Sequence, residues 1–139
     1  EELCSRAEHC SGEIRRKLRD WGVGTADSAA IIESLTKRRF IDDARFARIF
    51  TREKVEYAGW GRRKIAAALA AKSVPREAVS EAFESIDEDV YRRRLADAVA
   101  RKARSMQDAD TYEGRTRIFR HAVSRGYEPA LVIEAIKAL

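Results

Sequence analysis

Three stretches of this chain carry the same helical pattern of apolar residues, and this repetition limits the possible folds more than any other feature. In each stretch, apolar residues stand at positions i, i+4 and i+9. The matched stretches are Ile14-Leu18-Val23, Ile65-Leu69-Val74 and Ile118-Ala122-Tyr127. Their offsets are 51 and 53 residues. A regular period of this size is typical of a stacked helical array, in which each repeat completes the core of its neighbours.

A second set of apolar residues follows the same period. Counting from the last residue of each stretch, apolar residues recur at the eighth and ninth positions, as Ile31-Ile32, Ala82-Phe83 and Ala135-Ile136. Each unit of about fifty residues therefore has room for three helices. We predict an all-α fold with three tandem three-helix repeats in one continuous domain: repeat 1 at 1–40, repeat 2 at 41–86 and repeat 3 at 87–139.

Local signals predict where the first helix begins and ends. Ser11 is expected to cap a helix whose inner face carries Ile14, Leu18 and Trp21. Gly22 is expected to end it, because glycine suits the left-handed conformation that follows a helix. The chain opens with Glu1 and has no initiating methionine. We therefore expect a trimmed sequence in which repeat 1 is truncated at its N-terminus.

Similar signals mark the later helices. Asp42-Asp43 is expected to cap an aromatic and basic helix that breaks at Gly59-Trp60-Gly61. Paired catalytic carboxylates are a poorer interpretation, because adjacent helix positions point about 100° apart. Pro75 and Pro129 are expected at the first positions of two later helices, where the missing amide donor is not needed. Leu139 is predicted to face inward at the end of the last one.

Composition and charge narrow the function classes without selecting one. Apolar residues make up 45% of the chain, which excludes a disordered protein, and charged residues make up 37%. That charged share exceeds the roughly 25% of ordinary globular proteins and indicates much exposed helical surface. A net charge of +5 permits binding to DNA, RNA or an acidic protein. No signal-peptide pattern or apolar run of about 18 residues is present, so we expect no membrane segment.

The residues that build catalytic and metal sites are scarce. The sequence has two histidines and lacks a glycine-rich phosphate loop, a zinc-binding helix motif and a nucleophile elbow. Cys4 and Cys10 are six residues apart beside His9, whereas zinc sites need four ligands and prefer closer pairs. We expect ordinary reduced cysteines, a cytoplasmic location, no metal, no cofactor and no enzymatic activity.

Basic residues recur on the middle helix of each predicted repeat and on the helix before the third. One interpretation is a solvated helix surface. The other is a basic stripe that contacts an acidic protein groove or a nucleic-acid backbone, because the guanidinium group suits carboxylates and phosphates. Trp60 is either a packing residue that holds its turn or an exposed interface anchor. The candidate contact residues are Arg15, Arg16, Lys17, Arg48, Arg52, Trp60, Arg62, Arg63, Lys64, Arg92, Arg93, Arg94, Arg101, Lys102, Arg115, Arg117 and Arg120.

Short motifs in the same regions match a known pattern. Residues 40–47 read Phe-Ile-Asp-Asp-Ala-Arg-Phe-Ala, close to aromatic-Leu-Asp-Asp-x-x-Phe-Ala, and residues 59–65 read Gly-Trp-Gly-x-x-Lys-Ile, close to Gly-Tyr-Gly-x-x-Arg-Ile. Arg125-Gly126-Tyr127 is a third motif, and residues 11–18 match a fourth when one residue is dropped. These motifs resemble the RecX family, bacterial regulatory proteins that act on the RecA recombinase. The departures are Trp60 for tyrosine, Arg62 for proline and Val23 for an aromatic residue.

The resemblance covers about 11–139 and implies an elongated, curved array of three-helix repeats. It also implies a monomer that docks in the groove of the RecA–single-stranded DNA filament, without catalysis or cofactor. Family members usually inhibit the recombinase, ATPase and co-protease activities of RecA, in DNA repair, homologous recombination and the SOS response. The alternative is a direct DNA-binding helical module, with single- or double-stranded DNA as its partner. Binding to bare DNA that weakens steeply with salt would favour that alternative.

Overall fold

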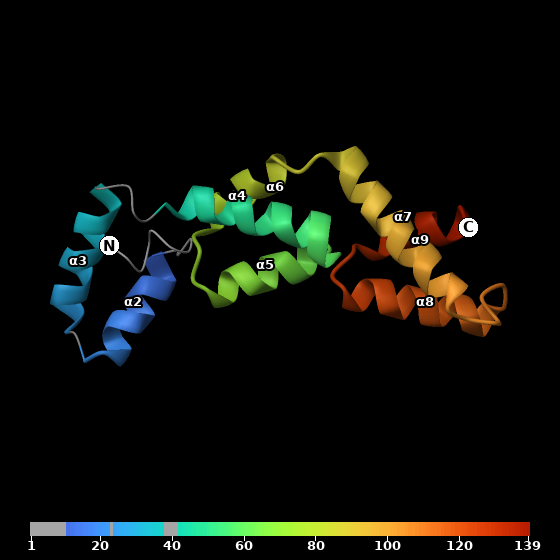
Figure 1. The fold of residues 1–139 in the computed structure, drawn as a ribbon, viewed down its shortest axis with the longest axis horizontal. Coiled ribbons are helices and arrows are strands. Elements are labelled where there is room, and N and C mark those ends of the chain that lie inside the picture. Colours follow the sequence, from blue (N-terminus) through green and yellow to red (C-terminus); the bar gives the residue numbers. More distant parts are fainter. Residues whose placement is uncertain (1–10, 23, 38–41) are drawn as a thin grey trace. The chain divides into compact units, whose positions relative to one another are not determined.

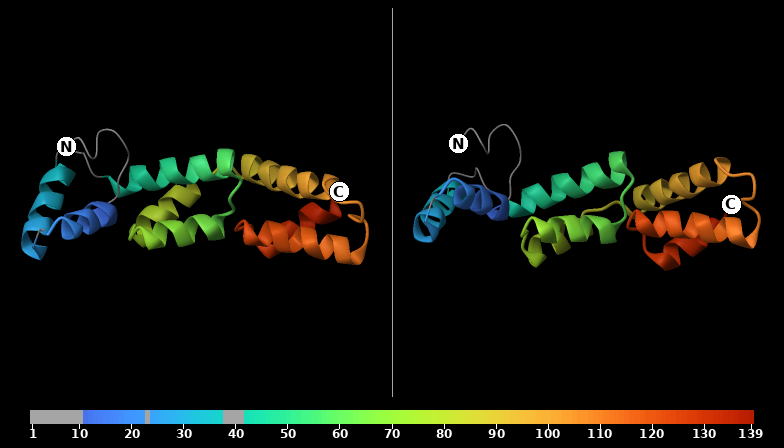
Figure 2. Two further views of the ribbon diagram at one scale, coloured as in Figure 1. Left: turned by 60° about the horizontal axis from the view of Figure 1, so that its bottom comes forward. Right: turned by 90° about the horizontal axis from the view of Figure 1, so that it is seen from below.

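The computed structural model describes residues 11–22, 24–37 and 42–139 (Figure 1). Every regular element in these ranges is helical, so the predicted all-α class is confirmed. The elements are α2 Ser11–Asp20, α3 Thr25–Lys37, α4 Asp43–Glu53, η1 Lys54–Ala58, α5 Arg62–Ala71, α6 Arg76–Glu84, α7 Glu88–Arg104, α8 Tyr112–Ser124 and α9 Pro129–Lys137. Element η1 is one π-helical turn, and Figure 2 shows the helices in two further views.

The helices form two compact units. The first unit comprises 1–50 and 68–84, and the second comprises 51–67 and 85–139. Helices α4 and α5 therefore begin in one unit and end in the other. These units follow compactness, whereas the predicted boundaries at 40 and 86 follow the sequence period, so those boundaries stay a prediction.

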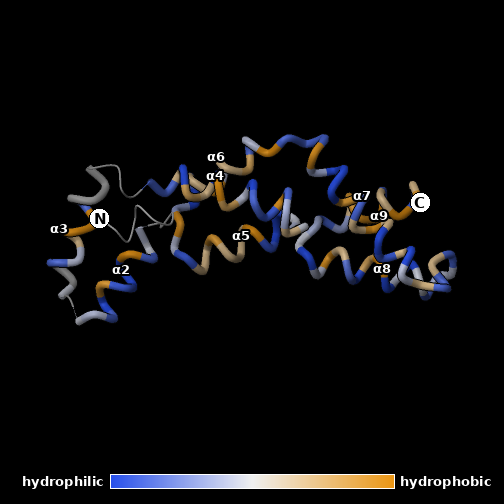
Figure 3. Tube along the Cα trace, in the orientation of Figure 1, coloured by the Kyte–Doolittle hydropathy of each residue, from blue (hydrophilic) through white to orange (hydrophobic). Residues whose placement is uncertain are grey.

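The repeated apolar positions form the core of the units. The isoleucines that open the three matched stretches, Ile14, Ile65 and Ile118, are 1%, 0% and 0% exposed. Leu69 and Tyr127, at later positions of the pattern, are also fully buried. Along each helix, hydrophobic residues alternate with hydrophilic ones (Figure 3). The period identified in the sequence is thus the period of core packing.

Three residues predicted to face inward are exposed instead. Trp21 is 64% exposed and Leu139 is 54% exposed. Each follows the last residue of its helix, Asp20 in α2 and Lys137 in α9, so helical periodicity no longer directs its side chain. Ile31 is 38% exposed, whereas the next residue, Ile32, is buried. Adjacent helix positions point about 100° apart, and the second isoleucine takes the inward direction.

The expected caps are correct in part. Asp42 caps α4, because its carboxylate accepts a hydrogen bond from the Arg45 amide at 3.0 Å. Ser11 is the first residue of α2 and does not precede the helix. Its amide and its hydroxyl both donate to the Asp43 carboxylate at 2.8 Å. Asp43 therefore joins the beginnings of α2 and α4, a role that neighbouring sequence positions could not reveal.

The predicted helix breaks agree with the structure, with two changes. The break at Gly59-Trp60-Gly61 is confirmed, since Gly59 ends η1 in the left-handed conformation at φ 68°. The π-helical turn that precedes this glycine is not encoded by a recognisable pattern. Pro75 lies one residue before α6, not at its first position, and its carbonyl accepts from the Val79 amide at 3.2 Å. Pro129 is at the first position of α9, as predicted. The predictions for Glu1, Cys4, His9, Cys10, Val23, Phe40 and Ile41 lie outside the described residues.

In the first unit, the beginning of α2 contacts the turn at the end of α5. A β-carbon placed on Gly12 would lie 2.3 Å from the Lys72 carbonyl oxygen, so only glycine permits this approach. The Lys72 ammonium pairs with the Glu13 carboxylate. The Arg16 guanidinium donates to the Ala71 carbonyl at 2.9 Å. These contacts form the first joint between the middle helices of successive repeats.

In the second unit, the beginning of α5 contacts the turn at the end of α8 in the same manner. The amides of Gly61 and Arg63 donate to the carbonyls of Arg125 at 2.8 Å and Gly126 at 3.0 Å. Gly126 has φ 98°, and a β-carbon there would lie 2.5 Å from Lys64 Cβ. A β-carbon on Gly61 would lie 2.3 Å from the Gly126 backbone. The second joint thus depends on two glycines whose backbones approach each other.

Substitution of Gly61 tests this joint. Gly61 and Gly24 both hold the N-cap position of a helix, since their carbonyls accept from Ile65 at 3.2 Å and Ser28 at 2.8 Å. Serine is a good N-cap residue, so capping alone predicts no penalty at either position. Because of the backbone clash, Gly61→Ser is expected to lower the free energy of unfolding by about 1–3 kcal/mol. The measurement is urea denaturation followed by circular dichroism.

Gly24→Ser is the matched control. Among described atoms, the nearest to a β-carbon at Gly24 is Asp27 Oδ2 at 3.9 Å, and this variant should retain its stability. Equal stability of the two variants would contradict the close packing at the second joint.

Candidate interaction surface

Arg62 lies at the centre of a half-buried polar network beside the second joint. Its guanidinium lies 4.0 Å from the centroid of the Tyr91 ring and donates to Glu128 Oε2 at 2.6 Å. The same guanidinium pairs with Glu88. Its amide donates to the Tyr91 hydroxyl at 2.9 Å, and that hydroxyl donates to Glu128 Oε1. The contacts give Arg62 an internal structural role, whatever else it binds.

The contacts within this network shift the pKa values of Glu128, Tyr91 and Arg62. Burial raises the pKa of Glu128, but the hydrogen bonds from Tyr91 and Arg62 outweigh burial and hold that pKa below its ordinary value. Burial, with the hydrogen bond to Glu128, raises the pKa of Tyr91 far above the physiological range. The pKa of Arg62 rises because the hydrogen bond to Glu128 outweighs the opposing effect of burial. The network is therefore a charged carboxylate–guanidinium pair with a neutral phenol at neutral pH.

Trp60 lies between two lysine side chains. The ammonium nitrogens of Lys54 and Lys64 are 4.7 Å and 4.4 Å from its ring centroid. Contacts of this kind contribute about 0.5–1 kcal/mol where solvent reaches them. The half-buried ring therefore helps to hold its own turn, as one interpretation of the sequence expected. Its role as an interface anchor stays a prediction.

Several candidate cations are engaged within the protein. The pairs are Arg48 with Glu81 at 3.3 Å, Arg92 with Glu134 at 3.1 Å, Arg94 with Asp97 at 3.4 Å, and Arg117 with Asp108. The hydrogen bond from Arg117 lowers the pKa of Asp108. Surface pairs of this kind contribute little to stability and can exchange partners on binding.

Other candidate cations have no ion pair with a described residue. They are Arg15, Lys17, Arg52, Arg63, Arg93, Arg101, Lys102, Arg115 and Arg120. Most are exposed, and they come from α2, α4, α5, α7 and α8. Their charges are available to an anionic partner without loss of an ion pair within the described part of the chain.

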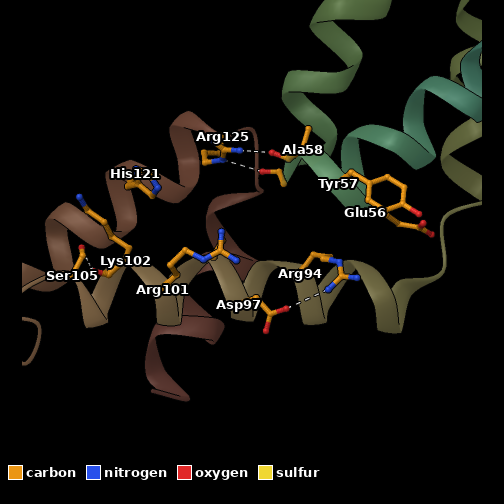
Figure 4. A pocket seen from close by; sticks show the side chains of 12 residues that line it. Glu56, Tyr57, Ala58, Arg94, Asp97, Arg101, Lys102, Ser105, His121 and Arg125 are labelled. Atoms are coloured by element: carbon orange, nitrogen blue, oxygen red, sulfur yellow. Dashed lines mark hydrogen bonds and ion pairs between the residues drawn. The ribbon is translucent and has the colours of Figure 1, made fainter.

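One groove in the second unit gathers several of these cations. It has a volume of about 450 Å³ and lies between α7, the end of η1 and the end of α8 (Figure 4). Arg101 and Lys102 line it from α7, Tyr57 from η1, and His121 and Arg125 from α8. Arg101 extends from α7 into the space between the other two walls (Figure 4). We call this feature the α7 groove.

Arg125 holds two walls of the α7 groove together. Its guanidinium donates to the carbonyls of Ala58 and of Gly59, the latter at 3.0 Å, where η1 ends. Partial burial lowers the pKa of His121, and the charges of Lys102 and Arg125 lower it further. The groove thus combines several cations with an imidazole, whose ring nitrogens can form hydrogen bonds.

Comparison with known proteins gives one consistent result. Residues 42–82, from the residue before α4 into α6, match the family model described as RecX, second three-helix domain. The regulatory protein RecX of Mycolicibacterium vanbaalenii is 29% identical over 132 residues, which is 91% of this chain and 72% of that protein. The regulatory protein RecX of Clostridium beijerinckii is 27% identical over 124 residues, 87% of this chain and 56% of that protein. The chain is thus similar to RecX proteins over most of its length.

Solved structures agree in fold. The crystal structure of RecX from Lactobacillus salivarius aligns with a TM-score of 0.88 at 17% identity, over 99% of this chain and 90% of that one. A second crystal structure, of a regulatory protein RecX, has the same TM-score at 16% identity and covers 68% of that chain. The three-helix repeat architecture is thus consistent with the RecX fold. The chain spans little more than half the length of the Clostridium beijerinckii relative.

Among the described residues, no group of histidine, cysteine, aspartate or glutamate side chains is arranged to hold a metal ion. No helix in the described ranges is long and apolar enough to cross a membrane. The RecX relatives are named as regulatory proteins and not as enzymes.

Tyr57, His121 and Arg125, which line the α7 groove, are not among the sequence-based candidates. Arg125 stands in the third RecX-like motif, next to a glycine at a helix end, and that position is a signal for close backbone contact. Nothing near Tyr57 in the sequence separates it from a core tyrosine such as Tyr91, because both lie in amphipathic helical segments. Its exposed fraction of 83% follows from the tertiary structure alone.

The Glu128 network predicts an acid-sensitive stability. Because the pKa of Glu128 is lower in the folded chain than its ordinary value of 4.5, this stabilisation is present above about pH 4.5. It is lost as the pH falls through the folded pKa. Glu128→Gln should lower the free energy of unfolding at pH 7 by about 1–3 kcal/mol, since it removes a charge-assisted acceptor. It should also lose less stability than the wild type between pH 5 and 3. Urea denaturation across this pH range gives both values.

Glu84→Gln is the control, because this exposed carboxylate on α6 has no ion pair with a described residue. Its stability profile should follow that of the wild type. A Glu128→Gln profile parallel to the wild type would contradict the role given to the Glu128 carboxylate.

Proposed function

We propose that this chain binds the RecA–single-stranded DNA filament and inhibits the recombinase, ATPase and co-protease activities of RecA. Similarity to RecX proteins, which are named regulatory proteins, is the observation that carries the proposal. Regulation would occur by binding, without a cofactor or a chemical step. We further propose that the protein acts in the cytoplasm as a monomer, in the recombination, repair and SOS processes that depend on RecA.

The geometry supports binding to an acidic surface. Exposed cations such as Arg63 on α5, Arg93 on α7 and Arg120 on α8 have no ion pair with a described residue. Arginine is enriched at interface hot spots, where its planar group pairs with carboxylates or phosphates. A filament of protein and DNA presents both kinds of acceptor. The proposed contact surface is therefore the exposed subset of the basic residues, not the whole of the predicted stripe.

Arg62 and Arg63 differ in their environment, so a substitution at Arg63 alone can test binding without disturbing the fold. Arg63 is exposed, whereas Arg62 is held in the Glu128 network, so reversal of both charges would mix two effects. We expect Arg63→Glu to keep the wild-type thermal midpoint and to weaken inhibition of RecA by roughly tenfold, which corresponds to about 1.4 kcal/mol. The measurement is the inhibitor concentration that halves the single-stranded-DNA-dependent ATP hydrolysis of RecA.

Arg104→Glu serves as the charge-matched control, since this exposed arginine on α7 is outside the proposed contact residues. Sedimentation with RecA filaments, with RecA alone and with bare single-stranded DNA identifies the partner. Wild-type potency of Arg63→Glu, or equal weakening by Arg104→Glu, would contradict the assignment. No sedimentation of the wild-type protein with filaments would contradict the proposed function.

A further inference from the structure

At one end of the α7 groove, two cationic side chains have no ion pair with a described residue and can therefore bind an anionic ligand. Arg125 is occupied by the carbonyls of Ala58 and Gly59. Arg94 is paired with Asp97 at 3.4 Å. Arg101 and Lys102, the next cations along α7, have no ion pair with a described residue. An oxyanion in the groove would therefore meet these two side chains without displacing an internal carboxylate.

The wall formed by η1 contributes an exposed aromatic ring. Tyr57 is 83% exposed, and its ring has no aromatic or cation–π contact with a described residue. It is placed by a defined backbone, because η1 is closed by Gly59 and held by Arg125. An exposed aromatic side chain on a positioned turn, beside free cations, is the arrangement by which proteins stack bases of single-stranded nucleic acids.

The acidic residues in the groove lining favour some anionic ligands over others. Glu56 and Asp97 also line the groove and would repel a run of carboxylates. A nucleobase carries N–H groups, such as the ring N3–H of thymine, that can donate to such carboxylates, and the phosphate of the same nucleotide can reach the cationic end. A duplex keeps its bases stacked inside, so it cannot offer one to Tyr57. The volume of about 450 Å³ is in the range of small-ligand sites and suits one nucleotide better than a folded peptide.

We propose that the α7 groove binds a nucleotide of single-stranded DNA, with its phosphate at Arg101 and Lys102 and its base stacked on Tyr57. The inference rests on the proposed function in one respect, namely that the bound strand belongs to a RecA filament. The groove itself is a site for bare single strands.

The test is binding of a fluorescently labelled oligothymidylate to the intact protein, followed by anisotropy at several salt concentrations. Tyr57→Ala should weaken binding by roughly 5- to 100-fold, whereas Tyr57→Phe, which keeps the ring, should bind like the wild type. Arg101→Ala should weaken binding and reduce the slope of log affinity against log salt by about 0.7, the value for one phosphate contact on a single strand.

The chain provides matched controls for both substitutions. Tyr112 is also 83% exposed but lies outside the α7 groove, and Arg104 is an exposed arginine on the same helix as Arg101. Tyr112→Ala and Arg104→Ala should bind the oligothymidylate like the wild type. Thermal midpoints of all variants should agree, because the substituted side chains are exposed.

Three results would overturn the inference. They are equal binding by Tyr57→Ala and Tyr112→Ala, competition by duplex DNA as strong as that by the single strand, and equally strong competition by polyglutamate. Failure of the proposed function can be told apart from failure of this inference. If the protein binds oligothymidylate through Tyr57 but leaves ATP hydrolysis by RecA unchanged, the proposed inhibition is refuted and the nucleotide site in the α7 groove stands.

Discussion

Backbone contact at the two joints is the constraint on which the described structure depends. The first amides of an α-helix have no acceptor within their own helix, and its last carbonyls have no donor. At the second joint these groups satisfy each other, because the amides of Gly61 and Arg63 donate to the carbonyls of Arg125 and Gly126. The partial charges of the two helix ends are complementary as well. This pairing requires glycine at the contact, since a β-carbon on Gly61 would overlap the Gly126 backbone.

The joints also divide the basic residues into two groups. Arg62 and Arg125 act as internal groups, one in the Glu128 network and the other on the carbonyls that end η1. Arg63, the next residue after Arg62, is exposed. Neighbouring side chains on a helix diverge by about 100°, so one arginine can stabilise the fold while the next meets a partner. A count of arginines on a helix therefore overstates the binding surface.

The α7 groove is a consequence of the same joint. Arg125 attaches the end of η1 to α8, and α7 forms the remaining wall. The arrangement brings Tyr57 and Arg101 into the lining of one groove, although 44 residues separate them in the sequence. Under the proposed function, contact of this groove with the strand would add to contact with the filament protein. Two linked sites of moderate affinity can bind more tightly than either alone.

The sequence by itself determined the helical class, the period of the core and the breaks at Gly22 and Gly59, because each depends on spacing or on the local preferences of glycine and apolar residues. It also carried the family motifs, which lie in the central helices. Tertiary structure decided which charges are internal, as at Arg62, and which aromatic rings are exposed, as at Tyr57. Those outcomes depend on which residues from distant segments of the chain lie beside each side chain. The period of the hydrophobic residues does not specify these tertiary neighbours. Trp21 and Leu139 show the same limit, since the period no longer applies once the helix has ended.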